Sequence, residues 1–128
     1  TYQPGNELNL TKPSRFLSSE GWAKKPSEQG TELSGQGGLY FVLPKQQAQP
    51  EQLTIQARIN SPQAGTLLKV ALGHDFTTTV KLAKAGINEI RLSLPGDSLT
   101  ADPKHPNFLA LSAPTPLNVQ SVRLTVAQ

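Results

Sequence analysis

The chain has 128 residues, enough for one domain with its own hydrophobic core and too few for a catalytic domain plus a second module. Twelve basic and nine acidic residues are interspersed and leave a formal net charge of +3, so no basic stripe could follow a phosphate backbone. Cysteine is absent, which excludes disulfides, thiolate chemistry and cysteine-ligated zinc. We therefore expect a single domain over residues 1–128 that binds no nucleic acid.

The start of the chain and its apolar runs bear on its context. The sequence opens at Thr1 and contains no methionine, which predicts a piece excised from a longer exported or membrane-anchored protein. No apolar run approaches the length that spans a bilayer, so we expect no membrane insertion by this domain itself.

Apolar and polar residues alternate through most of the chain, a pattern typical of strands with one face on a core and one in water. In chain order, strands are predicted near residues 7–10, 39–43, 53–59, 68–72, 76–82, 90–94, 108–113 and 119–126. The stretch 39–43 is almost continuously apolar, which predicts a central strand. The whole pattern predicts an all-β fold, an antiparallel two-sheet β-sandwich of the jelly-roll kind with about eight strands. Residues predicted to face the core include Ile55, Val70, Val80, Leu92 and Leu124.

Residue types that often carry catalysis or bind metals are present but do not form a recognisable pattern. His74 and His105 have no partner at a ligand spacing, so we expect no metal or base chemistry there. Three loop carboxylates, Asp75, Asp97 and Asp102, could serve calcium, but no loop alternates its acids as calcium loops do, which favours solvated turn residues. No nucleophile elbow occurs. We predict a protein that is not an enzyme and needs no cofactor.

The stretch from Ser18 to Pro44 holds the only tryptophan of the chain. An exposed Trp22 indole could stack on a sugar ring while Glu28, together with Thr31 or Ser34, bonds the sugar hydroxyls. The alternative is a Trp22 that packs over the edge of the sandwich. The nearby acids lie in one short segment, which disfavours the opposed carboxylate pair of a glycoside hydrolase.

Two segments resemble a known family. The stretch "YQPGNELNL…FLSSEGWAKKPSEQGTELSGQGGLYFVLP" resembles the β-sandwich accessory domain at the extracytoplasmic end of bacterial membrane glycosyltransferases and of phosphoglycerol transferases that act on periplasmic glucans. A later stretch, "VALGHDFTTTVKLAKAGINEIRLSLP", resembles a hairpin and strand common to such sandwiches. Two tryptophans of the family pattern downstream of Trp22 are missing here. The matching residues are Tyr2, Gly5, Gly21, Trp22, Glu28, Ser34, Gly35, Gly73, Gly86, Asn88, Ile90, Leu94 and Pro95.

The resemblance implies a non-catalytic, carbohydrate-binding-like accessory domain of a bacterial envelope protein, located outside the cytoplasm in the periplasm. Its partners would be a glycan or the remainder of its own polypeptide. The alternative is a structural or assembly module that packs against the catalytic or membrane part of its own protein and binds no glycan. An exposed Trp22 beside a groove would favour the first hypothesis, and a buried Trp22 with an exposed apolar patch elsewhere would favour the second.

Overall fold

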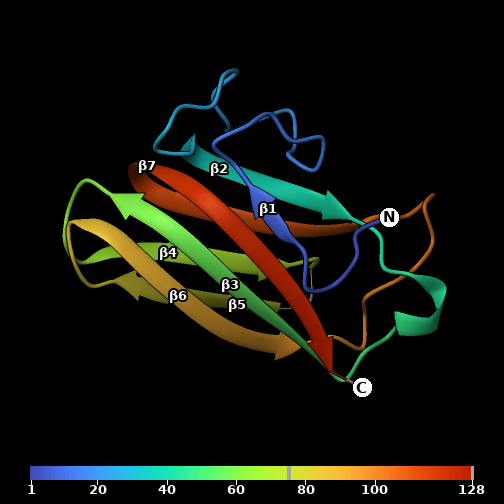
Figure 1. Cartoon of the computed structure of the whole chain (residues 1–128). Helices are drawn as coiled ribbons and strands as arrows, with labels where there is room; N and C mark the ends of the chain where they lie inside the picture. The colour runs from blue at the N-terminus through green and yellow to red at the C-terminus, as the bar shows by residue number, and fades with distance from the viewer. Residues whose placement is uncertain (75, 128) are drawn as a thin grey trace.

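The computed structural model describes residues 1–74 and 76–127, and within them the regular secondary structure consists almost entirely of antiparallel strands joined by loops (Figure 1). The only helical element in these ranges is a single 3-10 turn, η1, in the loop after β2. No helix in the described part of the chain has the length and apolar character to cross a membrane. The elements are β1 (Glu7–Asn9), β2 (Thr31–Phe41), η1 (Lys45–Gln47), β3 (Gln52–Ser61), β4 (Thr66–Leu72), β5 (Phe76–Leu82), β6 (Gly86–Pro95) and β7 (Asn107–Ala127).

The strands form the predicted all-β sandwich, with two packed layers that share one strand. The N-terminal half of β7 pairs with β2 and β4, and β5 extends this layer beyond β4. We call this layer the back sheet. The C-terminal half of β7 pairs with β1 and β3, and β6 extends the layer beyond β3. This second layer, in the foreground of Figure 1, is the front sheet.

The strand β7 passes from the back sheet to the front sheet through a segment with two pairing irregularities. Its pairing with β2 is interrupted around Pro114 and Pro116, which is where a residue without a backbone N–H can be tolerated in a strand. A second register shift leaves Gln120 as an extra residue opposite β3. Such bulges bend and twist a strand, and corners of this kind let one strand serve two sheets. The stretches 108–113 and 119–126, predicted as separate strands, therefore belong to one, and the described chain has seven strands rather than about eight.

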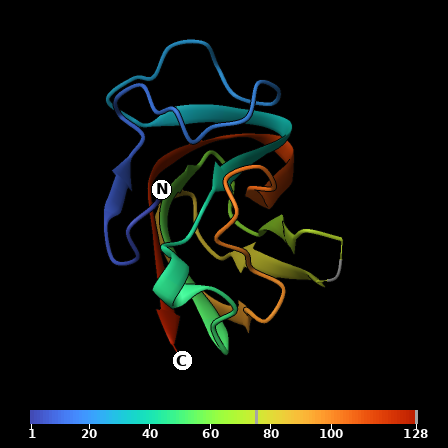
Figure 2. The same ribbon diagram turned by 90° about the vertical axis from the view of Figure 1, so that its right-hand side faces the viewer.

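The prediction that residues 39–43 form a central strand is wrong. Residues 39–41 end β2, which pairs with β7 on one side only and begins well before the predicted position, and residues 42 and 43 follow it outside any strand. The free edge of β2 is covered by the preceding loop, as Figure 2 shows. The backbone N–H of Ser18 donates to the Gly38 carbonyl and that of Tyr40 to the Phe16 carbonyl, each at 2.8 Å. An apolar edge strand is thus protected from pairing with another chain.

The predicted inward face is correct, with a graded degree of burial. Ile55, Val70 and Leu124 are 2% exposed or less. Val80 and Leu92 are only partly buried, because β5 and β6 are the outermost strands of their sheets and have fewer neighbours to cover them.

The N-terminal segment is fastened to the front sheet by Tyr2, whose side chain is 2% exposed. Its hydroxyl donates to the Asn6 carbonyl and accepts the backbone N–H of Leu124 at 2.9 Å. The ring also packs edge-on against Phe16 and Phe41. Burial raises the pKa of the Tyr2 phenol, because the charged phenolate would lose its hydration.

Adjacent leucines on β4 provide a matched test of the inward face. Leu68 is 0% exposed and Leu67 is 53% exposed. We expect Leu68→Ala to lower the free energy of unfolding by about 2–5 kcal/mol, since it leaves a cavity in the core. Leu67→Ala should change it by less than about 0.5 kcal/mol. Urea denaturation followed by circular dichroism measures both, and equal effects would contradict the assigned orientation of β4.

A second stability prediction concerns Tyr2. Tyr2→Phe should cost about 1–3 kcal/mol at neutral pH, because the buried N–H of Leu124 loses its acceptor. A phenol pKa raised in the folded state stabilises the fold below the unfolded value of about 10, and this contribution is lost as the pH rises through the folded value. The destabilisation caused by Tyr2→Phe should therefore shrink above about pH 10. Denaturation midpoints of both proteins across that range, showing a constant difference, would exclude this role.

Candidate functional site

Trp22 is held against the edge of the sandwich by β2. Its indole N–H donates to the Gly38 carbonyl at 3.1 Å, and the partly buried ring packs against the core. A Cβ atom placed on Gly37 would lie 2.8 Å from the indole nitrogen, so the missing side chain at this position makes room for the ring. The hydrogen-bond donor of the indole is therefore already engaged by the sheet.

A hollow of about 230 Å³ lies beside Trp22 in the loop before β2. Thr31 also lines it, but the Thr31 hydroxyl is buried and donates to the Leu10 carbonyl at 2.7 Å. Glu28 is exposed in the turn that precedes β2, and Ser34 is exposed on β2 with its hydroxyl directed to a neighbouring carboxylate. Neither lines the hollow. The structure thus brings two of the four sequence candidates together and places Glu28 and Ser34 outside that hollow.

The outer face of the back sheet carries a pair of aromatic side chains that the sequence analysis did not single out. Tyr40 on β2 and Phe108 on β7 are direct cross-strand partners, with ring centroids 4.6 Å apart. Tyr40 is 47% exposed. The Phe108 ring occupies the space where a side chain on Gly38 would stand, so the ring lies low over the strand. We call Tyr40 and Phe108 the aromatic platform.

Small and polar side chains continue this face away from the platform. In the next cross-strand row, Gly38, Ala110 and Ala71, the Phe108 ring covers Gly38, so the low floor consists of Ala110 on β7 and Ala71 on β4. The row beyond it is polar and consists of Gln36, Ser112 and Lys69. A shallow hollow of about 350 Å³ borders the polar row and includes the exposed Leu67. A flat ligand could therefore rest on the floor between an aromatic wall and a set of hydrogen-bonding groups.

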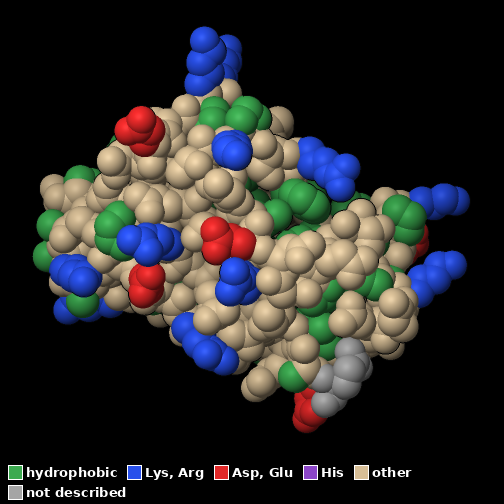
Figure 3. Space-filling model, viewed as in Figure 1, with side chains coloured by type: hydrophobic (Ala, Val, Ile, Leu, Met, Phe, Trp, Pro, Cys, Tyr) green, Lys and Arg blue, Asp and Glu red, His purple; other side chains and the backbone are tan. Residues whose placement is uncertain are grey.

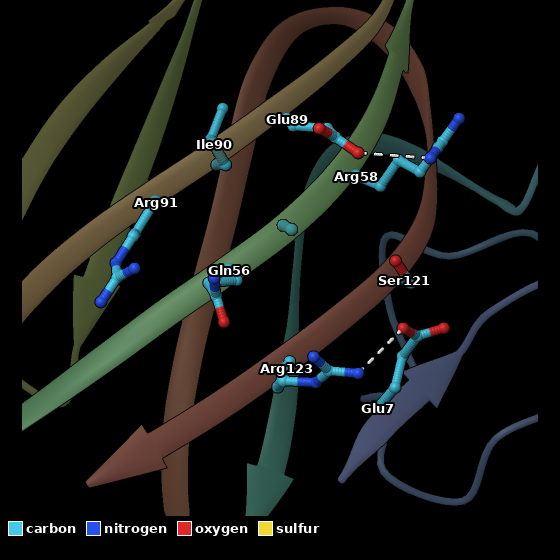
Figure 4. Close-up of a pocket in the computed structure, with 9 residues that line it drawn as sticks. Glu7, Gln56, Arg58, Glu89, Ile90, Arg91, Ser121 and Arg123 are labelled. Carbon is cyan, nitrogen blue, oxygen red and sulfur yellow. Dashed lines mark hydrogen bonds and ion pairs between the residues drawn. The ribbon is translucent and has the colours of Figure 1, made fainter. Parts of the chain in front are cut away.

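A second surface lies on the outer face of the front sheet, where charged side chains of both signs are interspersed (Figure 3). It contains a groove of about 370 Å³ that crosses β1, β7, β3 and β6. Two ion pairs border the groove, Arg58 with Glu89 at 3.2 Å and Arg123 with Glu7 at 3.3 Å (Figure 4). We call this surface the polar groove. Its lining consists of Glu7, Gln56, Ala57, Arg58, Glu89, Ile90, Arg91, Ser121 and Arg123.

None of the histidine and aspartate candidates that the structure describes lines the hollow beside Trp22 or the polar groove. His105 contacts Asp102 at 2.9 Å in an exposed loop, and the hydrogen bond from His105 is the main cause that lowers the pKa of the Asp102 carboxyl. Asp75 lies outside the described residues. Within residues 1–74 and 76–127, no three histidine or acidic side chains gather as a metal site would require.

Comparisons with known proteins identify the fold. The sequence matches no protein-family model and none of the curated proteins. Among solved structures, the C-terminal CBM6 of LamC, a marine laminarinase from Zobellia galactanivorans, superposes with a TM-score of 0.62 at 14% identity, over 94% of this chain and 99% of that one. CsCBM6-3 from Clostridium stercorarium, solved with cellobiose, gives 0.59 at 13% identity, over 99% and 98%. CBM35 of Abf62 from Cellvibrio japonicus gives 0.54 at 14% identity, over 96% and 95%.

The chain therefore has the fold of carbohydrate-binding modules, which is the architectural class expected from its strand pattern. At these identities the likeness concerns the fold alone. Neither the family models nor the curated proteins connect the chain to membrane glycosyltransferases or phosphoglycerol transferases, the narrower family suggested by the sequence resemblance.

The packing of Trp22 generates a stability prediction. Trp22→Phe keeps a ring but loses the bond to the Gly38 carbonyl, and should cost about 0.5–1.5 kcal/mol. Lys24→Ala, an exposed change in the same loop, should stay within about 0.5 kcal/mol. Denaturation of the three proteins, followed by far-ultraviolet circular dichroism, makes the comparison. A Trp22→Phe protein as stable as wild type would mean that the indole N–H is not needed at the sheet edge.

Proposed function

We propose that the chain is a non-catalytic glycan-binding module and that the outer face of the back sheet is its main contact surface. The observation that carries the proposal is the aromatic platform, where Tyr40, a residue 47% exposed, stands beside a floor of small residues. Aromatic faces attract the apolar C–H face of a sugar, and a low floor lets the sugar approach the sheet closely. The shared fold with carbohydrate-binding modules supports the same function.

Each part of this face has a distinct task in binding. Tyr40 provides the stacking surface, and Phe108 holds the Tyr40 ring from the neighbouring strand. The carboxamide of Gln36, the hydroxyl of Ser112 and the ammonium of Lys69 bond sugar hydroxyls on the far side of the floor. Stacking and a few hydrogen bonds exchanged against water give a weak site, about −4 to −6 kcal/mol, or millimolar to high micromolar affinity.

The residues around Trp22 support this surface rather than form it. Trp22 bonds the carbonyl of Gly38, whose outer side lies under the Phe108 ring. Glu28 and Ser34 remain exposed and could extend contact with a longer glycan. We also propose an accessory domain of a bacterial envelope protein, located in the periplasm and attached to a membrane glycosyltransferase or phosphoglycerol transferase. That context depends on the sequence resemblance alone.

The alternative function, a structural module that binds no glycan, is favoured by one observation on the same face. Leu67 is 53% exposed, and an exposed leucine adds nothing to hydroxyl recognition but would bury apolar area against the remainder of its own polypeptide. The two functions therefore differ in which exposed side chain matters. Glycan binding requires Tyr40, whereas packing against a protein surface would also require Leu67.

Substitutions at the aromatic platform test the proposal. Tyr40→Ala should weaken binding of cellotriose and other neutral gluco-oligosaccharides by about tenfold, while the more conservative Tyr40→Phe, which keeps the stacking face, should bind as wild type. Chemical-shift titration of each folded variant measures the affinity and locates the ligand. Leu67→Ala serves as the control on the same face and should leave glycan affinity unchanged.

Two results would contradict the proposal. One is the absence of any shift at Tyr40 and Phe108 with neutral or charged glycans at millimolar concentration. The other is unchanged affinity of the Tyr40→Ala protein. In either case the structural module takes the place of the glycan-binding module.

A further inference from the structure

Arginine is concentrated in the polar groove. The chain contains four arginines and eight lysines, and three of the arginines, but no lysine, line the groove. The guanidinium group is a planar fork that binds carboxylate or sulfate oxygens in pairs, which an ammonium group cannot do. The choice of cation on this face is therefore suited to a planar or tetrahedral oxyanion.

The strand register places two of these arginines on either side of a glutamine. Arg91 on β6 pairs with Gln56 on β3, and Gln56 pairs in turn with Arg123 on β7. Neighbouring strands lie about 4.8 Å apart, so the two arginine backbones are about 10 Å apart. Long side chains can span that gap from both ends, and Figure 4 shows Gln56 between them.

Much of the hydrogen-bonding capacity of this row is unused by the protein. Arg123 donates through Nη2 to Glu7, which leaves its other N–H groups available. Within residues 1–74 and 76–127, Arg91 forms no ion pair, and neither Arg91 nor Gln56 forms a side-chain hydrogen bond. Three arginines face two glutamates in the groove, so one positive charge is uncompensated.

Stability does not account for this arrangement. The two ion pairs are exposed, with side-chain exposures from 44% to 75%, and exposed pairs contribute little to folding. Arg91 takes part in neither pair. An exposed arginine without a partner, fixed in register with two other donors, is better explained by a ligand than by the fold.

We propose that the polar groove is a second binding site, which holds the carboxylate or sulfate ester of an anionic glycan above Gln56. The Arg91 guanidinium donates two parallel hydrogen bonds to the oxyanion. Arg123 donates a third from an N–H group that Glu7 does not use, and the Gln56 carboxamide donates to the oxyanion from the strand between them. Glu7, Glu89 and Ser121 can accept bonds from sugar hydroxyls on either side. The choice of a glycan as carrier of the anion depends on the proposed function, whereas the anion site depends on the arginines.

The two glutamates also limit which anions fit. Glu7 ends the row of donors as the cross-strand partner of Arg123, and Glu89 lies two residues from Arg91 on β6, in the neighbouring row. A ligand with charge at every unit, such as a nucleic acid, would bring phosphates against these carboxylates. An oligosaccharide with charges separated by neutral hydroxyls would not. The groove therefore favours sparse charge on a hydroxyl-rich chain.

The test is a titration of the whole chain with three oligosaccharide sets of equal length: a uronate set, a sulfate-ester set and a neutral gluco-oligosaccharide set. One anionic set should shift the Arg91 and Arg123 side-chain Nε–H signals and the Gln56 amide, and comparison of the two anionic arms identifies the oxyanion. Arg91→Gln should weaken that binding about tenfold. Added salt should weaken it further.

Matched variants distinguish specific binding by the groove arginines from nonspecific attraction of an anion to the net positive charge of the protein. Arg15→Gln removes the same charge from the one arginine outside the groove and should leave anionic-glycan affinity unchanged. Arg91→Lys keeps the charge without the fork and should recover only part of the affinity. A melting curve for each variant confirms that it is folded.

Four results would overturn the proposal: equal shifts at the groove with neutral and anionic sets, equal losses from Arg91→Gln and Arg15→Gln, inorganic sulfate or acetate bound as tightly as the glycan, or nucleic acid bound more tightly than any glycan. Failure of the main glycan site is distinguishable, because Tyr40→Ala acts on the opposite sheet. It should reduce the shifts at the aromatic platform and leave those of Arg91 and Arg123 unchanged.

Discussion

The backbone ladder of β7 carries hydrogen bonds to four other strands, and both sheets depend on the register of this one segment. Its N-terminal half places Phe108 on the outer face of the back sheet, and its C-terminal half places Arg123 on the outer face of the front sheet. The bulges near Pro114 and at Gln120 set the corner between the halves. The two proposed surfaces therefore lie on opposite sides of the sandwich and share one strand, and any slip in its register would disrupt both.

The local alternation of apolar and polar residues was sufficient to predict the strands that have one face exposed to solvent. The alternation over residues 53–59, 68–72 and 76–82 predicted β3, β4 and β5 because each side chain there reports directly on which face it occupies. Periodicity failed where a distant partner overrides local preference. From local sequence alone, Pro114 and Pro116 predict the end of a strand. The chain nevertheless stays extended through both prolines, because the pairing of β7 with β2 is interrupted there and no backbone N–H is needed.

The candidate surfaces were harder to predict than the fold, since they depend on pairing between distant residues. The outward position of Tyr40 follows from simple alternation within residues 39–43, but its contact with Phe108 requires the β2–β7 register. To predict the row of Arg91, Gln56 and Arg123, both the β3–β6 register and the β3–β7 register must be known. For Trp22 the sequence left stacking and packing open, because nothing local reveals that the Gly38 carbonyl accepts its N–H.

The paired glycines of β2 explain how one short stretch can serve both the core and the surface. Successive residues of a strand point to opposite sides, so the empty position of Gly37 admits the Trp22 indole at the sandwich edge and that of Gly38 admits the Phe108 ring on the outer face. A side chain at either position would displace an aromatic ring. Trp22 in turn bonds the carbonyl of Gly38, directly beneath the platform. Trp22, the first binding candidate from the sequence, thus contacts β2 beside the proposed surface, where its hydrogen bond fixes the strand that carries Tyr40.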